Sequence, residues 1–160
     1  MDNSKVFIEG QRVAREALHY DDELVVRFRI NYGGLLDFVR GDRQPAETVL
    51  VGSRPPSNDA RWNRLKTLGI EPGIFDRSFY SGREKRVDAE LTNAIRDALE
   101  DNPEPGTMAL VAGDADYVPA PKRCLKGKWQ VELCFWTRAS CDVERMGGAK
   151  SVDLAKGFDQ

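Results

Sequence analysis

Short apolar runs alternate with amphipathic stretches along the chain. The apolar runs have the length and composition of buried β-strands, and they are predicted at residues 6–8, 48–51, 70–75, 108–112, 131–136 and 152–154. The amphipathic stretches predict helices near residues 13–18, 35–39, 57–68, 86–100, 118–125 and 140–146. The clearest helix is 86–100, where Val87, Leu91, Ile95 and Leu99 recur every four residues, and Gly69 is a typical helix stop. Residues 27–30 are predicted to be extended or irregular.

Strands that alternate with helices and are apolar throughout indicate a parallel sheet with both faces covered. Proline-rich breaks at residues 54–56 and 102–105 fall between elements and are too short to separate two domains. The sequence therefore predicts one α/β domain over residues 1–160. We expect a three-layer fold with a mainly parallel sheet of five or six strands.

The amino-acid composition excludes several classes of protein and of catalytic site. The 24 Lys and Arg residues nearly balance the 26 Asp and Glu residues, which excludes a histone-like composition. Three cysteines without a Cys/His pairing, and His19 as the single histidine, argue against a zinc site and against Ser-His or Cys-His catalysis. No apolar run approaches the roughly 20 residues of a membrane span. We expect a cytoplasmic protein without a membrane partner.

Carboxylates follow two of the predicted strands, where ligands bind in doubly wound sheets. Glu9 follows the first strand, and Asp114 and Asp116 follow the strand at 108–112, while Asp88 opens the longest helix. Four converging acids repel one another unless cations neutralise them, and hard oxygen ligands favour Mg²⁺ or Mn²⁺. The alternative for each acid is structural: Asp114 as a helix cap, Asp88 as a residue favoured by the helix dipole, Glu9 as an arginine partner.

Several segments resemble the NYN domain family, which belongs to the PIN-like metal-dependent ribonucleases. The most specific is Gly-Asp-Ala-Asp-Tyr-Val-Pro at 113–119, and the others lie at 7–11, 54–58, 84–88, 129–133 and 151–154. The resemblance implies a Rossmann-like (PIN-like) fold and an endoribonuclease that hydrolyses RNA phosphodiester bonds with Mg²⁺ or Mn²⁺. Its catalytic and metal-binding residues would be Glu9, Asp88, Asp114 and Asp116. The alternative is a catalytically inactive nucleic-acid-binding or regulatory interaction module on the same fold.

Two positions depart from the family pattern. The family usually has Asp at the position of Glu9 and Asn at that of Arg12, and both changes are expected to weaken catalysis. Arg12 would take the place of a cation by pairing with Glu9 or Asp114. The residues expected to bind the substrate, an RNA that is single-stranded or structured, are Arg12, Arg54, Asn58, Lys85 and Arg86. Self-association of the domain is left open by the sequence.

Overall fold

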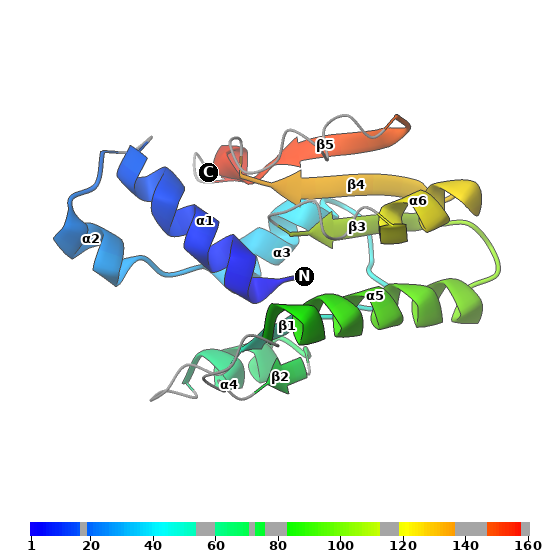
Figure 1. Ribbon diagram of the computed structural model, residues 1–160, viewed down its shortest axis with the longest axis horizontal. Helices are drawn as coiled ribbons and strands as arrows, with labels where there is room; N and C mark the ends of the chain where they lie inside the picture. The colour runs from blue at the N-terminus through cyan, green and yellow to red at the C-terminus, as the bar shows by residue number, and fades with distance from the viewer. Residues whose placement is uncertain are drawn as a thin grey trace.

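A computed structural model describes residues 1–16, 19–53, 60–70, 73–75, 83–112, 119–136 and 147–157 (Figure 1). The described helices are α1 (Asn3–Glu16), α2 (Asp22–Arg27), α3 (Tyr32–Arg40), α4 (Ala60–Thr67), α5 (Arg83–Asp101) and α6 (Pro119–Lys126). The described strands are β1 (Val51–Ser53), β2 (Gly73–Phe75), β3 (Thr107–Val111), β4 (Gln130–Phe135) and β5 (Ala149–Asp153), which leads into a 3₁₀ helix at Leu154–Gly157.

All described strand pairs are parallel, as predicted. They form two ladders rather than one continuous sheet: β1 pairs with β2, and β4 lies between β3 and β5. In Figure 1 the arrows of β3, β4 and β5 point the same way, and α5 runs along this ladder. The α/β class and the parallel ladders agree with the predicted fold.

Met1 and Asp2 connect the two ladders. Asp2 forms a parallel bridge with Val51, and the amide of Val51 donates to the carbonyl of Met1 at 2.9 Å. On the other side, the amide of Asp2 donates to the carbonyl of Val111, the last residue of β3, at 2.8 Å. The strands therefore lie in the order β2, β1, Met1–Asp2, β3, β4, β5. This is the order of a doubly wound sheet in which the chain starts at the centre.

The strand predicted at residues 6–8 is wrong, because these residues lie within α1. Val6, Val13 and Ala14 are buried and Ile8 is 58% exposed, which is the pattern of a helix with one apolar face. A run of three apolar residues is compatible with either period, so only its relation to Val13 and Ala14 distinguishes helix from strand. The helix α2 was also not predicted. Its signal is Asp21, whose carboxylate accepts a hydrogen bond from the amide of Leu24 at 2.8 Å as an N-cap.

The other described elements lie near their predicted positions. The helices α3, α4, α5 and α6 agree with the sequence pattern, and the backbone of Gly69 after α4 has the positive φ of 77° that favours glycine. The strands β3, β4 and β5 agree to within a few residues, whereas β1 and β2 each begin three residues later than predicted. The polar helix predicted at 140–146 lies outside the described residues.

Alternate residues of the central strands pack into two apolar clusters. On β4, Leu133 and Phe135 pack with residues of α5 and α6, whereas Cys134 packs with residues of α1 and α3. Helices therefore cover both faces, which makes three layers. Cys124 and Cys134 are buried free thiols, and burial raises the pKa of Cys134 to about 12. Both act as small apolar residues of the core.

One ion-pair network ties β4 to β5 and to the end of α3. The carboxylate of Glu132, whose side chain is 12% exposed, accepts from Arg43 at 2.7 Å and from Lys150 at 3.0 Å. Burial alone would raise the pKa of Glu132, but the hydrogen bonds and charges of Arg43 and Lys150 outweigh it, so the pKa is lowered. The guanidinium of Arg43 also donates to the carbonyls of Val39 and Arg40.

Glu132→Gln should lower the free energy of unfolding by about 1 kcal/mol at pH 7, because both cationic partners are partly exposed and screened. A carboxylate with a lowered pKa contributes stability above its usual value of 4.5, and that contribution is lost as the pH falls through the folded-state pKa. Urea unfolding of both proteins at pH 7 and pH 3 measures the difference, which should be smaller at pH 3. Glu90→Gln, at an exposed position on α5, is the control and should change little at either pH.

Candidate active site

The carboxyl ends of the parallel strands meet at one edge of the sheet. Ser53, Val111 and Phe135 end β1, β3 and β4, and the two-residue segment Met1–Asp2 ends at Asp2 between the first two. From Met1–Asp2 the chain proceeds to β1 on one side and later to β3 on the other. The order of strands reverses at this point, so the sheet edge beside Asp2 is where a doubly wound fold is expected to bind its ligand.

Asp2 is the charged residue that the sequence reasoning missed. Its side chain is 1% exposed, and no other charged residue is buried among the described side chains. Its carbonyl accepts the first helical hydrogen bond of α1 from the amide of Val6 at 3.2 Å, so Asp2 occupies the N-cap position. A carboxylate there is stabilised by the helix dipole. The signal in the sequence was Asp2-Asn3-Ser4, a run of capping residues directly before the apolar face of α1.

Glu9 and Arg12 lie within α1 and form an ion pair. The guanidinium of Arg12 lies 2.6 Å from the carboxylate of Glu9, which confirms the predicted pairing of these two residues. The predicted position of Glu9 at the end of a strand is wrong, because it stands seven residues after Asp2. At 1.5 Å per residue this is about 10 Å along the helix axis. Glu9 is therefore two turns away from the sheet edge.

The backbone of α5 places Asp88 near the same edge. The helix begins at Arg83, after β2, and its residue Leu91 is buried against the ladder of β3 and β4. Asp88 lies in its second turn, and Lys85 and Arg86 lie in its first turn. Of the side chains at 83–88 the structure gives no description.

The remaining predicted site residues lie outside the described part of the chain. These are Asp114 and Asp116, which come between β3 and α6, and Arg54 and Asn58, which come between β1 and α4. The pairing of β3 with β4 extends to Ala112, whose amide donates to the carbonyl of Cys134 at 3.2 Å. Asp114 thus follows Val111, the last residue of β3, by three positions.

The model of the NYN domain family matches residues 3–146. The chain belongs to the NYN domain family. This agrees with the family indicated by the sequence motifs, and it supports a nuclease fold of the PIN-like kind for the NYN domain described here. No curated protein and no solved structure matches the chain.

The described part of this NYN domain lacks a complete metal site. Among side chains that the structure describes, no three His, Cys, Asp or Glu residues are grouped closely enough to hold a metal ion. The structure does not describe the side chains of three of the four predicted metal-binding acids, namely Asp88, Asp114 and Asp116. In the described part of the chain, no helix has both the length and the apolar character that crossing a bilayer requires.

Proposed function

We propose that this NYN domain is a metal-dependent endoribonuclease whose site is built around Asp2, at the carboxyl edge of the sheet. The observation that supports it is the buried carboxylate of Asp2 at the point where the strand order reverses. The family's usual aspartate, assigned from the sequence to Glu9, then corresponds to Asp2. Three residues further on, Lys5 stands where the family usually has asparagine.

The donor set fits a hard divalent cation. Asp2, Asp88, Asp114 and Asp116 supply only carboxylate oxygens, which are the ligands that Mg²⁺ and Mn²⁺ prefer. When bound, such a cation supplies Lewis acidity, which offsets the charge that develops on a phosphate during hydrolysis. We leave Glu9 out of this site, because it lies two turns along α1 and is paired with Arg12.

Three cations and one amide of the chain would hold the RNA. Lys85 and Arg86 belong to the first turn of α5, and Arg54 and Asn58 follow β1, so all four come from segments next to the carboxyl edge. Contacts of this kind bind phosphates without reading the base sequence. We leave Arg12 out of this group, because its guanidinium is paired with Glu9 on α1.

Cleavage of a labelled single-stranded RNA across Mg²⁺ and Mn²⁺ titrations tests the proposal. We expect cleavage that EDTA abolishes and that Asp114→Asn lowers at least about 100-fold, equivalent to about 2.7 kcal/mol at the transition state. Asp101→Asn, at the exposed far end of α5, is the matched control and should retain activity. RNA binding without cleavage in any metal would instead support the inactive binding module.

Binding at different salt concentrations tests the contacts to phosphate. Lys85→Ala combined with Arg86→Ala should weaken RNA binding and reduce the slope of log K against log[salt] by up to about two, because each phosphate contact releases counterions. The control pair is Lys122→Ala with Arg123→Ala, two exposed cations on α6. An equal loss of slope in both pairs would mean that RNA is held by charge over the whole surface, without a defined contact at α5.

A further inference from the structure

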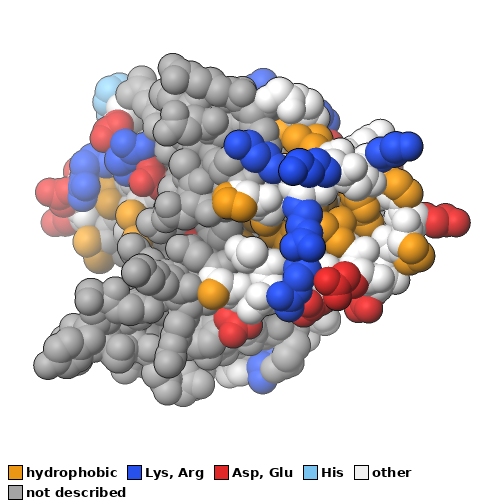
Figure 2. All heavy atoms as spheres, turned by 45° about the vertical axis from the view of Figure 1, so that its right-hand side comes forward, with side chains coloured by type: hydrophobic (Ala, Val, Ile, Leu, Met, Phe, Trp, Pro, Cys, Tyr) orange, Lys and Arg blue, Asp and Glu red, His pale blue; other side chains and the backbone are white. Residues whose placement is uncertain are grey.

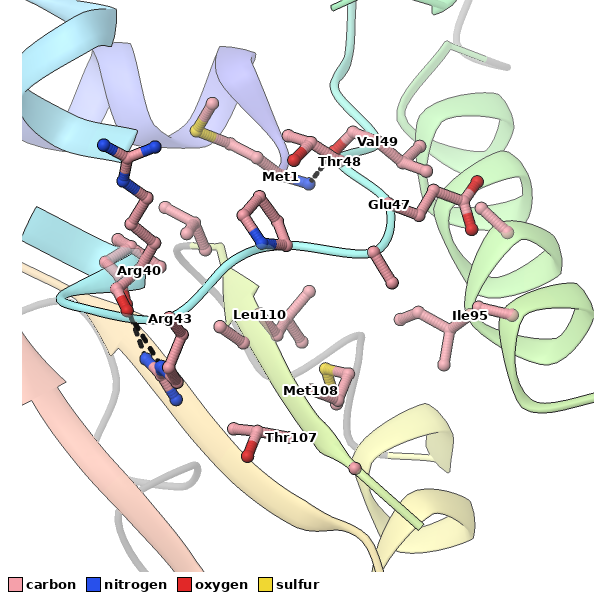
Figure 3. A pocket seen from close by; sticks show the side chains of 18 of the residues that line it. Met1, Arg40, Arg43, Glu47, Thr48, Val49, Ile95, Thr107, Met108 and Leu110 are labelled. Atoms are coloured by element: carbon pink, nitrogen blue, oxygen red, sulfur yellow. Dashed lines mark hydrogen bonds between the residues drawn. The ribbon is translucent and has the colours of Figure 1, made fainter. Parts of the chain in front are cut away.

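A groove of about 620 Å³ lies between residues 44–49 and β3, and Met1 closes one end of it. Its walls are apolar, with Leu36 and Val39 from α3 on one side and Ile95 and Leu99 from α5 on the other. Figure 3 shows Met1 at one end of the groove, Val49 and Leu110 along its length, and Arg43 at its border. Figure 2 shows this end of the molecule, where exposed apolar side chains lie beside a band of Lys and Arg side chains.

The burial of β3 changes at the level of Met1, where the segment Met1–Asp2 begins. Leu110 and Val111 are buried, whereas Thr107 and Ala109 are exposed. The opposite wall has the same gradient, from the buried Leu50 to the exposed Glu47. Strands in the middle of a parallel sheet are normally buried on both faces along their whole length. Here β3 lies inside the strand order, so its exposed half marks a place where a neighbouring strand fits.

The backbone of both walls is oriented for such a strand. The backbone groups of Gly106 and Ala112 form hydrogen bonds with β4. In a parallel ladder the residues alternate, so the amides and carbonyls of the odd-numbered residues of β3 point away from β4. The hydrogen bond from the amide of Asp2 to the carbonyl of Val111 agrees with this. Ala109 therefore directs its amide and carbonyl into the groove. On the facing wall, the carbonyl of Val49 accepts from the amino group of Met1 at 2.7 Å.

The backbone amides and carbonyls that face the groove belong to two strand edges, and no strand pairs with these edges in the described structure. Of the two walls, only the positions next to Met1–Asp2 have a backbone partner across the groove among the described residues. Backbone donors and acceptors beside an apolar groove need a partner, and an extended peptide is the partner that satisfies both walls at once.

We propose that the groove is a strand-acceptor site for an extended apolar peptide segment of four or five residues that runs parallel to β3 and directly into Met1. The length follows from Thr107 to Val111, which span about 13 Å at 3.3 Å per residue. The apolar character follows from the α3 and α5 side chains that cover the two faces, since an unpaired charge there would be costly to bury. The segment would extend the pairing that Met1 and Asp2 already make with β1 and β3. This inference is independent of the proposed nuclease chemistry.

The test compares two chains that carry five extra residues before Met1. One carries Lys-Val-Ile-Val-Val, and its matched control carries Gly-Ser-Gly-Ser-Gly. We expect the apolar extension to raise the melting temperature by at least about 5 °C over the control, a shift that is large for a domain of this size. It should also slow hydrogen exchange at the amides of Val49, Ala109 and Val111. Equal melting temperatures and equal exchange in the two chains would overturn the proposal.

A groove variant and a free peptide make the result specific. Ala109→Lys places a charge on the exposed part of β3, and it should abolish the difference between the two extensions. If that difference persists unchanged in Ala109→Lys, the extension binds elsewhere and the proposal fails. If the separate peptide protects the same amides of the unextended chain while the extended chain gains nothing, the occupant is another polypeptide and the proposal is likewise overturned.

Discussion

Asp2→Asn should lower metal-dependent RNA cleavage at least about 100-fold, whereas Glu9→Gln should leave it within about twofold. Asp2 and Glu9 are alternative candidates for the first acid of the proposed metal site. The sequence motifs assign this acid to Glu9, whereas the structure favours Asp2. Asp2 ends the central segment of the sheet and is held there from both sides by Val51 and Val111. Glu9 lies about 10 Å further along α1 and is already paired with Arg12.

The design separates lost chemistry from lost folding. Asparagine is as good an N-cap as aspartate, so Asp2→Asn should keep α1 and leave the melting temperature of the metal-free protein within a few degrees. The stabilisation that Mn²⁺ gives the wild type should disappear in Asp2→Asn and persist in Glu9→Gln, because ligand binding stabilises a protein in proportion to its affinity. Thermal melts with and without Mn²⁺ therefore accompany the cleavage assays.

A combined variant extends this comparison. Glu9→Asp with Arg12→Asn restores the residues that the family motif would have at these positions, and we expect no gain in cleavage because the pair lies outside the site. A tenfold or larger gain, or full activity in Asp2→Asn, would return the first acid to Glu9.

The long helices and strands could be predicted from the sequence because the hydrophobic pattern of each fits only one type of secondary structure. The four-residue repeat of α5 covers most of its length, and the apolar runs of β3 and β4 are five and six residues long in the structure. The run at residues 6–8 is shorter, and Gly10 after it resembles a turn. In the structure Gly10 lies inside α1, where an added Cβ would come within 2.7 Å of Phe28 and 3.1 Å of Trp136. Close packing, rather than a turn, explains this glycine.

Asp2 could not be found by the same reasoning, because it depends on contacts between distant segments. The segment Met1–Asp2 is too short to have an apolar period, and its place in the sheet is set by Val51 and Val111, far along the chain. The rule that ligands bind at the carboxyl edge was useful, but it was applied to a strand that does not exist. Asp88, by contrast, lies on a helix whose start and direction the sequence predicts, so its placement near this edge was predictable.

Trp136→Ala should lower the free energy of unfolding by about 3–5 kcal/mol, the usual cost of removing a large aromatic side chain from a core. Trp136 follows β4, is 4% exposed, and lies against the face of α1 at Gly10. Its indole N–H donates to the carbonyl of Val6 at 2.8 Å, so it joins the end of the central ladder to the helix that Asp2 caps. Urea unfolding with a shared m-value measures the change.

Trp136→Phe distinguishes packing from the hydrogen bond. Phenylalanine keeps much of the ring but cannot donate to Val6, so it should lower the free energy of unfolding by about 1–2 kcal/mol. Trp129→Ala is the matched control on a half-buried tryptophan that packs at Gly106, near the amino ends of the strands, and it should cost less than Trp136→Ala. Because Trp136 fixes the helix that begins directly after Asp2, Trp136→Ala should also lower RNA cleavage more than Trp129→Ala does. A Trp136→Ala variant as stable as the wild type would show that α1 does not pack on the end of β4.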